Sequence, residues 1–117
     1  MVDDDDMIRD VCSLVLTEVG YQVETAADGI EALNRLKDSE YDLVITDINM
    51  PRLDGIGLYL SVLREYPYLK DRFFFLTGNP SWEARLVLSE INSEYLAKPF
   101  HIDDFLRRIE ILIEQIH

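Results

Sequence analysis

Residues 43–51 read LVITDINMP, and this stretch decides the fold class of the 117-residue chain. Its apolar and β-branched start is typical of a strand that is buried on both faces, as in a parallel sheet. The run ends in a carboxylate, Asp47, and Pro51 then breaks the strand. Because a charge is costly to bury, its position at the end of an apolar strand requires an explanation.

Strand and helix patterns alternate along the rest of the chain. Segment 8–19 has apolar residues at helical spacing and is followed by Gly20, a typical helix end. Asp28 and Glu31 resemble a capping box at the start of a helix, and Asp54 is expected to cap another. Strands are predicted at 21–25, 43–47, 72–77 and 94–98, and further helices after the loop at 51–57, after 81 and from about 103.

This alternation predicts an α/β fold, an open doubly wound parallel sheet with helices on both faces, and one domain over residues 1–117. Ligands of such folds bind outside the carboxyl ends of the strands. Asp47, Thr77 and Lys98 each end a predicted strand. We therefore expect them to meet in one crevice.

Composition narrows the function. The net charge of −12 disfavours direct binding to nucleic acid, which requires clustered basic residues. No apolar run reaches the roughly 18 residues needed to cross a bilayer, and no signal peptide is visible, so we expect a cytoplasmic protein without membrane contact. The single cysteine, Cys12, is expected to be a small buried hydrophobe.

Acidic residues at the start of the chain extend the predicted crevice. If residues 1–2 end a first strand, Asp3 and Asp4 join Asp47, and three converging carboxylates require a compensating cation. An oxygen-rich site with room for water suits Mg²⁺. A Lys98 ammonium and a Thr77 hydroxyl beside such a metal suit a phosphoryl group in transit. The chain lacks a GxxxxGK loop, so the phosphate must come from a donor other than ATP bound in that way.

The chain resembles a response-regulator receiver domain of two-component signalling. The resemblance covers nearly the whole chain and rests on four motifs in order: VDDD at 2–5, DINMPRLDG at 47–55, LTG at 76–78 and KPF at 98–100. It implies a flavodoxin-like (βα)5 fold of three layers, similar to chemotaxis regulators. The five-stranded parallel sheet would have the order 2-1-3-4-5.

The resemblance also implies a role for each motif residue. Asp47 is the expected phosphoacceptor, and Mg²⁺ is expected on Asp3, Asp4, Asp47 and the main-chain carbonyl of Asn49. The expected phosphoryl-binding and switch residues are Thr77, Gly78, Lys98 and Tyr95, with a cis peptide bond before Pro99. Gly78 would leave access for the phosphodonor, and Tyr95 would turn inward when Thr77 moves toward phosphate.

A receiver implies partners. The expected donor is a phosphohistidine on a sensor kinase or a phosphotransfer protein. Phosphorylation would then switch a surface at about residues 80–116, which contacts an unidentified output partner or domain or forms a homodimer. Such a domain is a signalling device that assists its own phosphorylation and dephosphorylation rather than a turnover enzyme.

Two alternatives stay open. The first is a receiver-like interaction module that works without phosphorylation, which would not need Mg²⁺. The second is a hydrolase with an aspartyl nucleophile. Such enzymes use a second acid/base carboxylate two residues beyond the nucleophile, where this chain has Asn49.

The predicted first strand is short. Only Met1 and Val2 precede the acidic pair, whereas a central strand of this sheet usually has about five residues. We expect a longer form of the protein to carry several apolar residues upstream.

Overall fold

A computed structural model describes residues 1–78, 81–90 and 95–116. Strands and α-helices alternate from residue 29 onward, as the sequence predicts, whereas the first two helices follow one another without a regular strand between them. The elements are α1 (Asp6–Glu18), α2 (Gly29–Asp38), β1 (Val44–Asp47), α3 (Gly55–Glu65), the 3₁₀ helix η1 (Pro67–Leu69), β2 (Phe73–Thr77), α4 (Trp82–Glu90), β3 (Tyr95–Ala97) and α5 (Ile102–Ile116).

The strands β1, β2 and β3 form a parallel sheet in that order. Two single bridges continue the sheet beyond β1, because Val2 pairs in parallel with both Thr46 and Ala26. Segment 1–3 therefore lies between β1 and the segment that ends at Ala26. The resulting order is the 2-1-3-4-5 order predicted from the sequence.

The prediction of a regular strand over residues 21–25 is wrong in this structure. That segment is irregular, and only Ala26, just beyond it, forms a bridge. Backbone hydrogen bonds join this part of the chain to segment 1–3 only near Ala26. The Ala26 N–H donates to the Met1 carbonyl at 3.0 Å, and the Asp3 N–H donates to the Ala26 carbonyl at 3.1 Å. A strand needs a hydrogen-bonded neighbour along its length, and residues 21–25 have one only at their carboxyl end.

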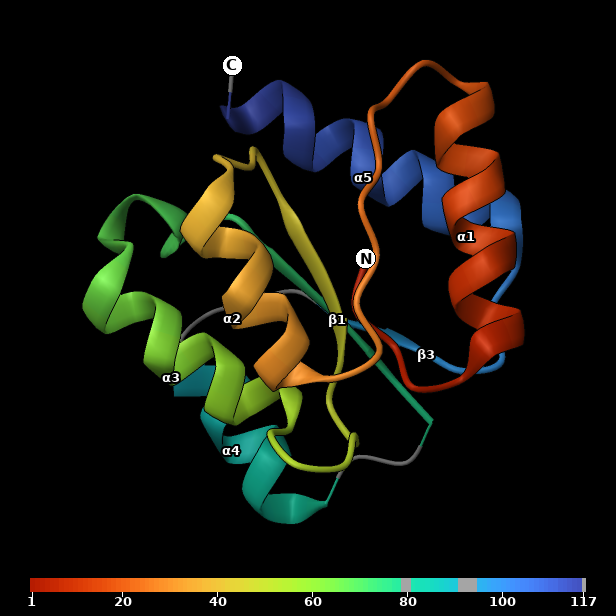
Figure 1. Cartoon of the computed structure of the whole chain (residues 1–117). Coiled ribbons are helices and arrows are strands. Elements are labelled where there is room, and N and C mark those ends of the chain that lie inside the picture. Colours follow the sequence, from red (N-terminus) through yellow and green to blue (C-terminus); the bar gives the residue numbers. More distant parts are fainter. Residues whose placement is uncertain (79–80, 91–94, 117) are drawn as a thin grey trace.

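Helices cover both faces of the sheet, which gives the three layers (Figure 1). Helices α1 and α5 lie on one side, and α2, α3 and α4 lie on the other. The strand residues alternate between two apolar cores, since Phe74 and Leu76 pack with α1 and α5, whereas Phe73 and Phe75 pack on the opposite side. Cys12 of α1 is buried in the first of these cores, as predicted.

Aspartates begin three of the helices. The carboxylate of Asp5 accepts hydrogen bonds from the N–H groups of the first turn of α1. Asp28 and Asp54 cap α2 and α3 in the same way, which confirms the predicted caps. Gly20 follows the end of α1 with φ +104°, a backbone conformation that glycine adopts at low cost.

A cavity of about 700 Å³ opens at the amino end of the sheet. Its lining comes from segment 20–24, from β1 and the residues before it, from Met1, and from side chains of α1 and α5. In the described part of the chain, no helix combines the length and the apolar character that crossing a bilayer would require.

Candidate functional site

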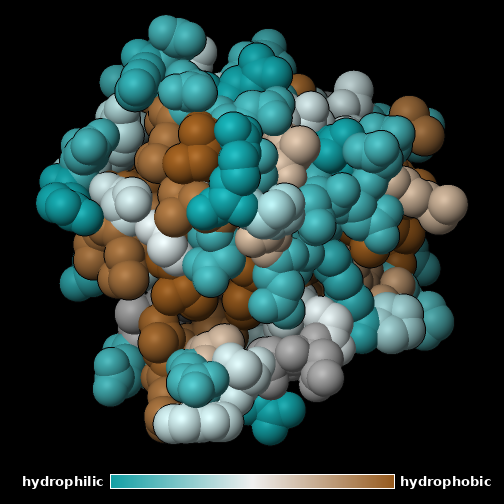
Figure 2. All heavy atoms as spheres, turned by 60° about the horizontal axis from the view of Figure 1, so that its bottom comes forward, coloured by the Kyte–Doolittle hydropathy of each residue, from teal (hydrophilic) through white to brown (hydrophobic). Residues whose placement is uncertain are grey.

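The carboxyl ends of the strands bring the predicted site residues together. Asp47 is the last residue of β1, and Thr77 is the last residue of β2. The Lys98 N–H donates to the Thr77 carbonyl at 2.8 Å, so the residue that follows β3 lies beside the end of β2. This edge of the sheet faces the bottom of Figure 1. Figure 2 turns it forward and shows hydrophobic atoms on the left and mostly hydrophilic atoms in the centre and upper right.

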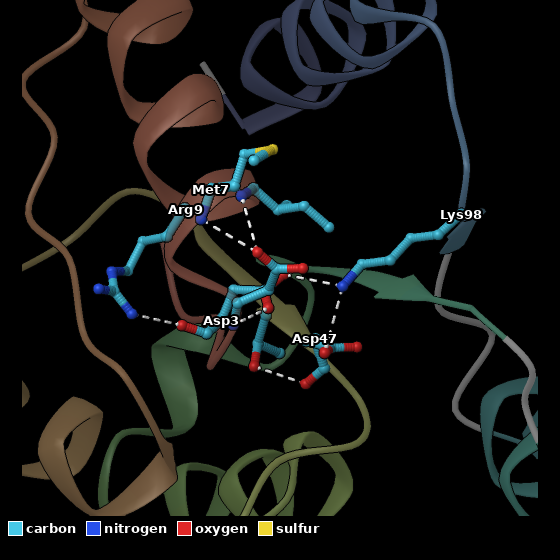
Figure 3. Close-up of polar contacts among 8 residues, drawn as sticks. Asp3, Met7, Arg9, Asp47 and Lys98 are labelled. Carbon is cyan, nitrogen blue, oxygen red and sulfur yellow. Dashed lines mark hydrogen bonds and ion pairs between the residues drawn. The ribbon is translucent and has the colours of Figure 1, made fainter.

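Lys98 joins two buried carboxylates. Its Nζ lies 2.9 Å from Asp3 Oδ2 and 3.2 Å from Asp47 Oδ2, and its side chain extends from the end of β3 to a position between them (Figure 3). Asp3 is fully buried, and Asp47 is nearly so. Two buried anions therefore share one cation, which leaves this cluster with excess negative charge.

Asp3 is held firmly in place. Its Oδ1 accepts the N–H of Asp5 at 2.9 Å, and its carbonyl oxygen accepts Arg9 Nη1 at 2.8 Å. The contact of Arg9 was not predicted from the sequence. The only signal available was a basic residue one turn into a helix that follows an acidic run, and this pattern does not fix a contact.

Three carboxylates are close enough to bind one metal ion. Each of Asp3, Asp4 and Asp47 offers an oxygen, and these oxygens all lie within 4.8 Å of one another. Asp4 is exposed, so water can complete the coordination shell. Carboxylate oxygens with access to water match the preference of Mg²⁺.

The pKa values of Asp47 and Lys98 reflect a cluster with more negative than positive charge. Burial, followed by repulsion from Asp3, raises the pKa of Asp47, and Lys98 only partly offsets this. Burial acts to lower the pKa of Lys98, but its contacts with Asp3 and Asp47 outweigh this effect and raise the pKa. Lys98 therefore stays protonated at neutral pH, and a second cation would favour the ionised form of Asp47.

Thr77 carries the third polar group of the site. Its side chain is fully buried, and its Oγ1 has no hydrogen-bond partner among the described residues. A buried hydroxyl without a partner is unfavourable, because folded proteins pair most of their buried polar groups. The hydroxyl is thus available to a ligand. At the neighbouring Gly78, an added Cβ would meet no atom of the described residues within 4 Å, so those residues leave the approach on this side open.

The remaining predicted residues are Asn49, Pro99 and Tyr95. Asn49 is exposed in the loop after β1, and its N–H hydrogen-bonds to Asp47 and offsets a small part of the rise in the Asp47 pKa. The peptide bond between Lys98 and Pro99 is cis. Tyr95 begins β3 and is 41% exposed, so its ring is not in the interior in this structure. The carbonyl ligand at Asn49 and the switch role of Tyr95 stay predictions.

Two features of the loop at 48–54 were not predicted. A Cβ on Gly55 would lie 2.2 Å from the Asp47 carbonyl oxygen, so only glycine fits there. Arg52 forms an ion pair with Asp28 at the start of α2, with 2.6 Å between Nη2 and Oδ2. A glycine after an aspartate indicates a turn, but no sequence signal reports a contact between residues 24 positions apart.

Comparison with known proteins agrees with this geometry. Residues 1–110 match the family described as "Response regulator receiver domain". The response regulator MprA from Mycobacterium sp. (strain KMS) is 36% identical over 98% of this chain and 50% of its own length. MprA from Mycobacterium tuberculosis (strain ATCC 25177 / H37Ra) is 35% identical with the same coverage. The chain thus spans about half the length of these curated relatives.

Solved structures resemble the fold closely. A CheY-like receiver domain protein from Methanospirillum hungatei JF-1 has a TM-score of 0.89 at 28% identity and covers 98% of this chain and 91% of its own. The chemotaxis protein CheY4 of Vibrio cholerae has a TM-score of 0.85 at 33% identity and covers 95% and 93%. Fold, sequence and the geometry of the acidic cluster agree, and the chain belongs to the response-regulator receiver domain family of two-component signalling.

Proposed function

We propose that Asp47 accepts a phosphoryl group from a phosphohistidine on a sensor kinase or a phosphotransfer protein. The observation that carries this proposal is the position of Lys98, whose Nζ contacts both Asp3 and Asp47 at the mouth of the sheet. An ammonium group at this point can neutralise phosphoryl oxygens next to the attacking carboxylate. The buried Thr77 hydroxyl, which has no partner among the described residues, can donate to one of those oxygens.

The transfer is a displacement at the phosphorus atom. A carboxylate oxygen of Asp47 forms the new O–P bond, the N–P bond of the phosphohistidine breaks, and its electron pair stays on the imidazole. Lys98 and Thr77 stabilise the charge on the transferring oxygens throughout. The raised pKa of Lys98, which keeps its side chain protonated, supports this role.

The acidic cluster fits Mg²⁺. Asp3, Asp4 and Asp47 would hold the ion, with the Asn49 carbonyl as a further ligand. When bound, Mg²⁺ would offset the repulsion between the carboxylates and neutralise charge on the phosphoryl group. The described residues alone leave the cluster short of one positive charge, which supports a requirement for the ion.

The domain as a whole, residues 1–117, would act as a cytoplasmic signalling switch rather than a turnover enzyme. Its output surface would comprise α4, β3 and α5, which contact an output partner or domain or a second copy of the chain. Part of this expected surface, at 80 and 91–94, lies outside the described residues. A receiver-like module that works without phosphorylation gains no support from the comparisons.

The test uses a small phosphodonor. Acetyl phosphate with Mg²⁺ should add one phosphoryl group to the protein, measured by intact mass spectrometry, and Asp47→Asn should abolish the addition. Asp10→Asn, which removes an exposed carboxylate on α1, is the matched control and should label normally. Labelling that persists in Asp47→Asn would contradict the assignment of Asp47, and normal labelling without Mg²⁺ would contradict the role of the metal.

A further inference from the structure

The loop between β1 and α3 is tied to the start of α2 by Arg52. Its Nε donates to Asp28 Oδ2 at 2.8 Å, and its Nη2 lies 2.6 Å from the same oxygen. Arg52 has φ 65°, and it is the one non-glycine residue in the described part of the chain with a positive φ. Because this conformation is unfavourable for most residues, its presence here indicates that the surrounding contacts hold it.

Asp28 is a fixed anchor for this contact. Its carboxylate is buried, and its other oxygen, Oδ1, accepts the Glu31 N–H at 2.9 Å as the cap of α2. The two carboxylate oxygens thus have separate partners, one in the helix and one in the loop. The position of the Arg52 guanidinium is therefore set by a rigid helix rather than by a mobile side chain.

A second tie lies next to the first. The Gly29 N–H donates to the Leu53 carbonyl at 3.1 Å, and a Cβ on Gly29 would approach the same oxygen to 2.5 Å. The loop and the first turn of α2 are therefore in direct backbone contact. The start of α2 and this loop also lie in the lower half of the molecule in Figure 1, above α4.

A hydrogen bond also joins the end of this loop to its start, directly after β1. The Gly55 N–H donates to the Ile48 carbonyl at 2.8 Å, which joins the two ends of the loop. Arg52 lies inside this closed loop, and so does the exposed Asn49, whose N–H hydrogen-bonds to Asp47 of the acidic cluster. Fixing Arg52 thus restricts the backbone that carries Asn49.

We propose that Arg52 is a positioning residue for the divalent cation. By its ion pair with Asp28 it holds loop 48–54 in the conformation in which the loop backbone can contribute to a cation bound by Asp3, Asp4 and Asp47. This inference rests on the proposed function. A loop that is ordered before binding loses less conformational entropy on binding, so the affinity for the cation rises.

The charge of Arg52 makes the test decisive. Removing a positive charge from the protein would, by electrostatics alone, strengthen rather than weaken the binding of Mg²⁺. Removing a positioning contact weakens binding. Arg52→Ala should therefore lower the Mg²⁺ affinity of the whole chain, measured by isothermal titration calorimetry, roughly tenfold, as is typical for residues that orient metal ligands.

A second variant separates positioning from backbone strain. Arg52→Asn removes the guanidinium, and asparagine tolerates positive φ better than alanine does. It should show the same loss of affinity. Arg72→Ala, which removes a charge that pairs with Asp42 at 4.0 Å near the opposite end of the sheet, is the matched control and should bind Mg²⁺ normally. Hydrogen exchange at 48–54 in metal-free protein should be faster in both Arg52 variants.

The outcomes distinguish this inference from the proposed function. If Arg52 positions the loop, the rate of labelling by acetyl phosphate in Arg52→Ala should recover at saturating Mg²⁺. Unchanged or tighter Mg²⁺ binding in both Arg52 variants, with Asp47 still labelled, would overturn the positioning role and leave the phosphoacceptor intact. Loss of labelling specificity for Asp47 would instead overturn the proposed function.

Discussion

Gly55 lies against the main chain of Asp47 so closely that a Cβ at Gly55 would come within 2.2 Å of the Asp47 carbonyl oxygen. The contact involves backbone on both sides, so no side-chain rotation can relieve it. It fixes the start of α3 directly beside the end of β1. The proposed phosphoacceptor thus owes its position partly to a residue that has no side chain.

Gly55→Ala should therefore destabilise the fold by about 2–3 kcal/mol, because the β1 end and the α3 start must move apart. Urea denaturation at neutral pH measures the change. Gly57→Ala is the matched control: its Cβ would meet mainly the Leu53 Cδ1 at 2.7 Å, and a side-chain end can move. Since alanine also favours the helix, this control should be close to neutral. Equal losses in the two variants would contradict the backbone contact.

Thr77→Val should separate stability from phosphorylation. The Thr77 hydroxyl is buried without a partner among the described residues, so replacing it by a methyl group of similar size removes an unsatisfied polar atom. We expect the free energy of unfolding to be unchanged or to rise by about 1 kcal/mol. Labelling by acetyl phosphate should nevertheless slow, because one donor to the phosphoryl oxygens is lost.

The proposed role of Thr77 requires both results, the unchanged or increased stability and the slower labelling. A clear loss of stability in Thr77→Val would mean that the hydroxyl already has a structural partner in solution. Labelling at the rate of the unchanged protein would mean that the hydroxyl does not reach the phosphoryl group. Thr77→Ser, which keeps the hydroxyl, should restore most of the rate.

The central part of the site was predictable because one rule places it. Asp47, Thr77 and Lys98 each follow an apolar strand, and the carboxyl ends of parallel strands meet at one edge. The structure brings these three residues together as expected. The caps at Asp28 and Asp54 were predictable as well, since they depend only on local sequence.

The contacts that were not predicted depend on how distant parts of the chain pack together. Arg9 reaches the Asp3 carbonyl, and Arg52 reaches Asp28, only because of how α1 and the loop lie on the sheet. The strand expected at 21–25 failed for a related reason. Alternating apolar residues favour a strand, but hydrogen bonds to a neighbouring segment decide whether one forms, and here they occur only near Ala26.

Removal of divalent cations should reveal the repulsion inside the cluster. Asp3 and Asp47 are both buried beside one ammonium group. In EDTA, Asp47→Asn should therefore be more stable than the unchanged protein, by an amount on the order of 1 kcal/mol. Thermal unfolding followed by circular dichroism measures the difference.

Addition of Mg²⁺ should reverse this order. At about 100 times its dissociation constant, the ion stabilises a folded protein by roughly 2.7 kcal/mol. The unchanged chain should gain this stability, whereas Asp47→Asn should gain much less because it lacks one ligand. A variant that responds to Mg²⁺ as strongly as the unchanged protein would place the metal away from Asp47.

Asp28 predicts a pH dependence with a defined sign. The N–H of Glu31 and the ion pair with Arg52 lower the pKa of Asp28, although burial opposes them. A lowered pKa means that the charged carboxylate stabilises the fold above the unfolded-state value, near pH 4, and that this stability is lost as pH falls below it. Asp28→Asn keeps the acceptor for Glu31 but loses the charge, so it should cost about 1 kcal/mol or less at pH 7.

The difference between Asp28→Asn and the unchanged protein should be smaller at pH 3 than at pH 7, because protonation of Asp28 below its unfolded-state pKa removes stability that the carboxylate contributes. Urea denaturation at pH 7 and pH 3 gives both values. Exposed pairs are screened, and the Arg52 side chain is 60% exposed, so added salt should also reduce the difference at pH 7. A difference that grows as the pH falls would contradict the assigned sign.

The cavity at the amino end of the sheet leads to a final prediction about stability. It lies between segment 20–24 and β1, and apolar side chains contribute to both walls, among them Tyr21, Val23, Leu43 and Ile45. The Met1 nitrogen donates to the Glu24 carbonyl at 2.9 Å, the place that a peptide N–H of a continuing strand would take. An extended apolar segment joined to Met1 would therefore pair with both neighbours and fill the cavity.

A four-residue extension Ile-Leu-Ile-Val before Met1 should raise the free energy of unfolding by roughly 2 kcal/mol, because the burial of each apolar side chain outweighs the cost of ordering it. For a domain of this size the melting temperature should rise by at least about 5 °C. The polar extension Ser-Asn-Ser-Asn is the matched control and should give no increase. Backbone amides at 22–25 should become protected from hydrogen exchange only with the apolar extension. An equal gain from both extensions, or none from either, would mean that the cavity does not accept a strand.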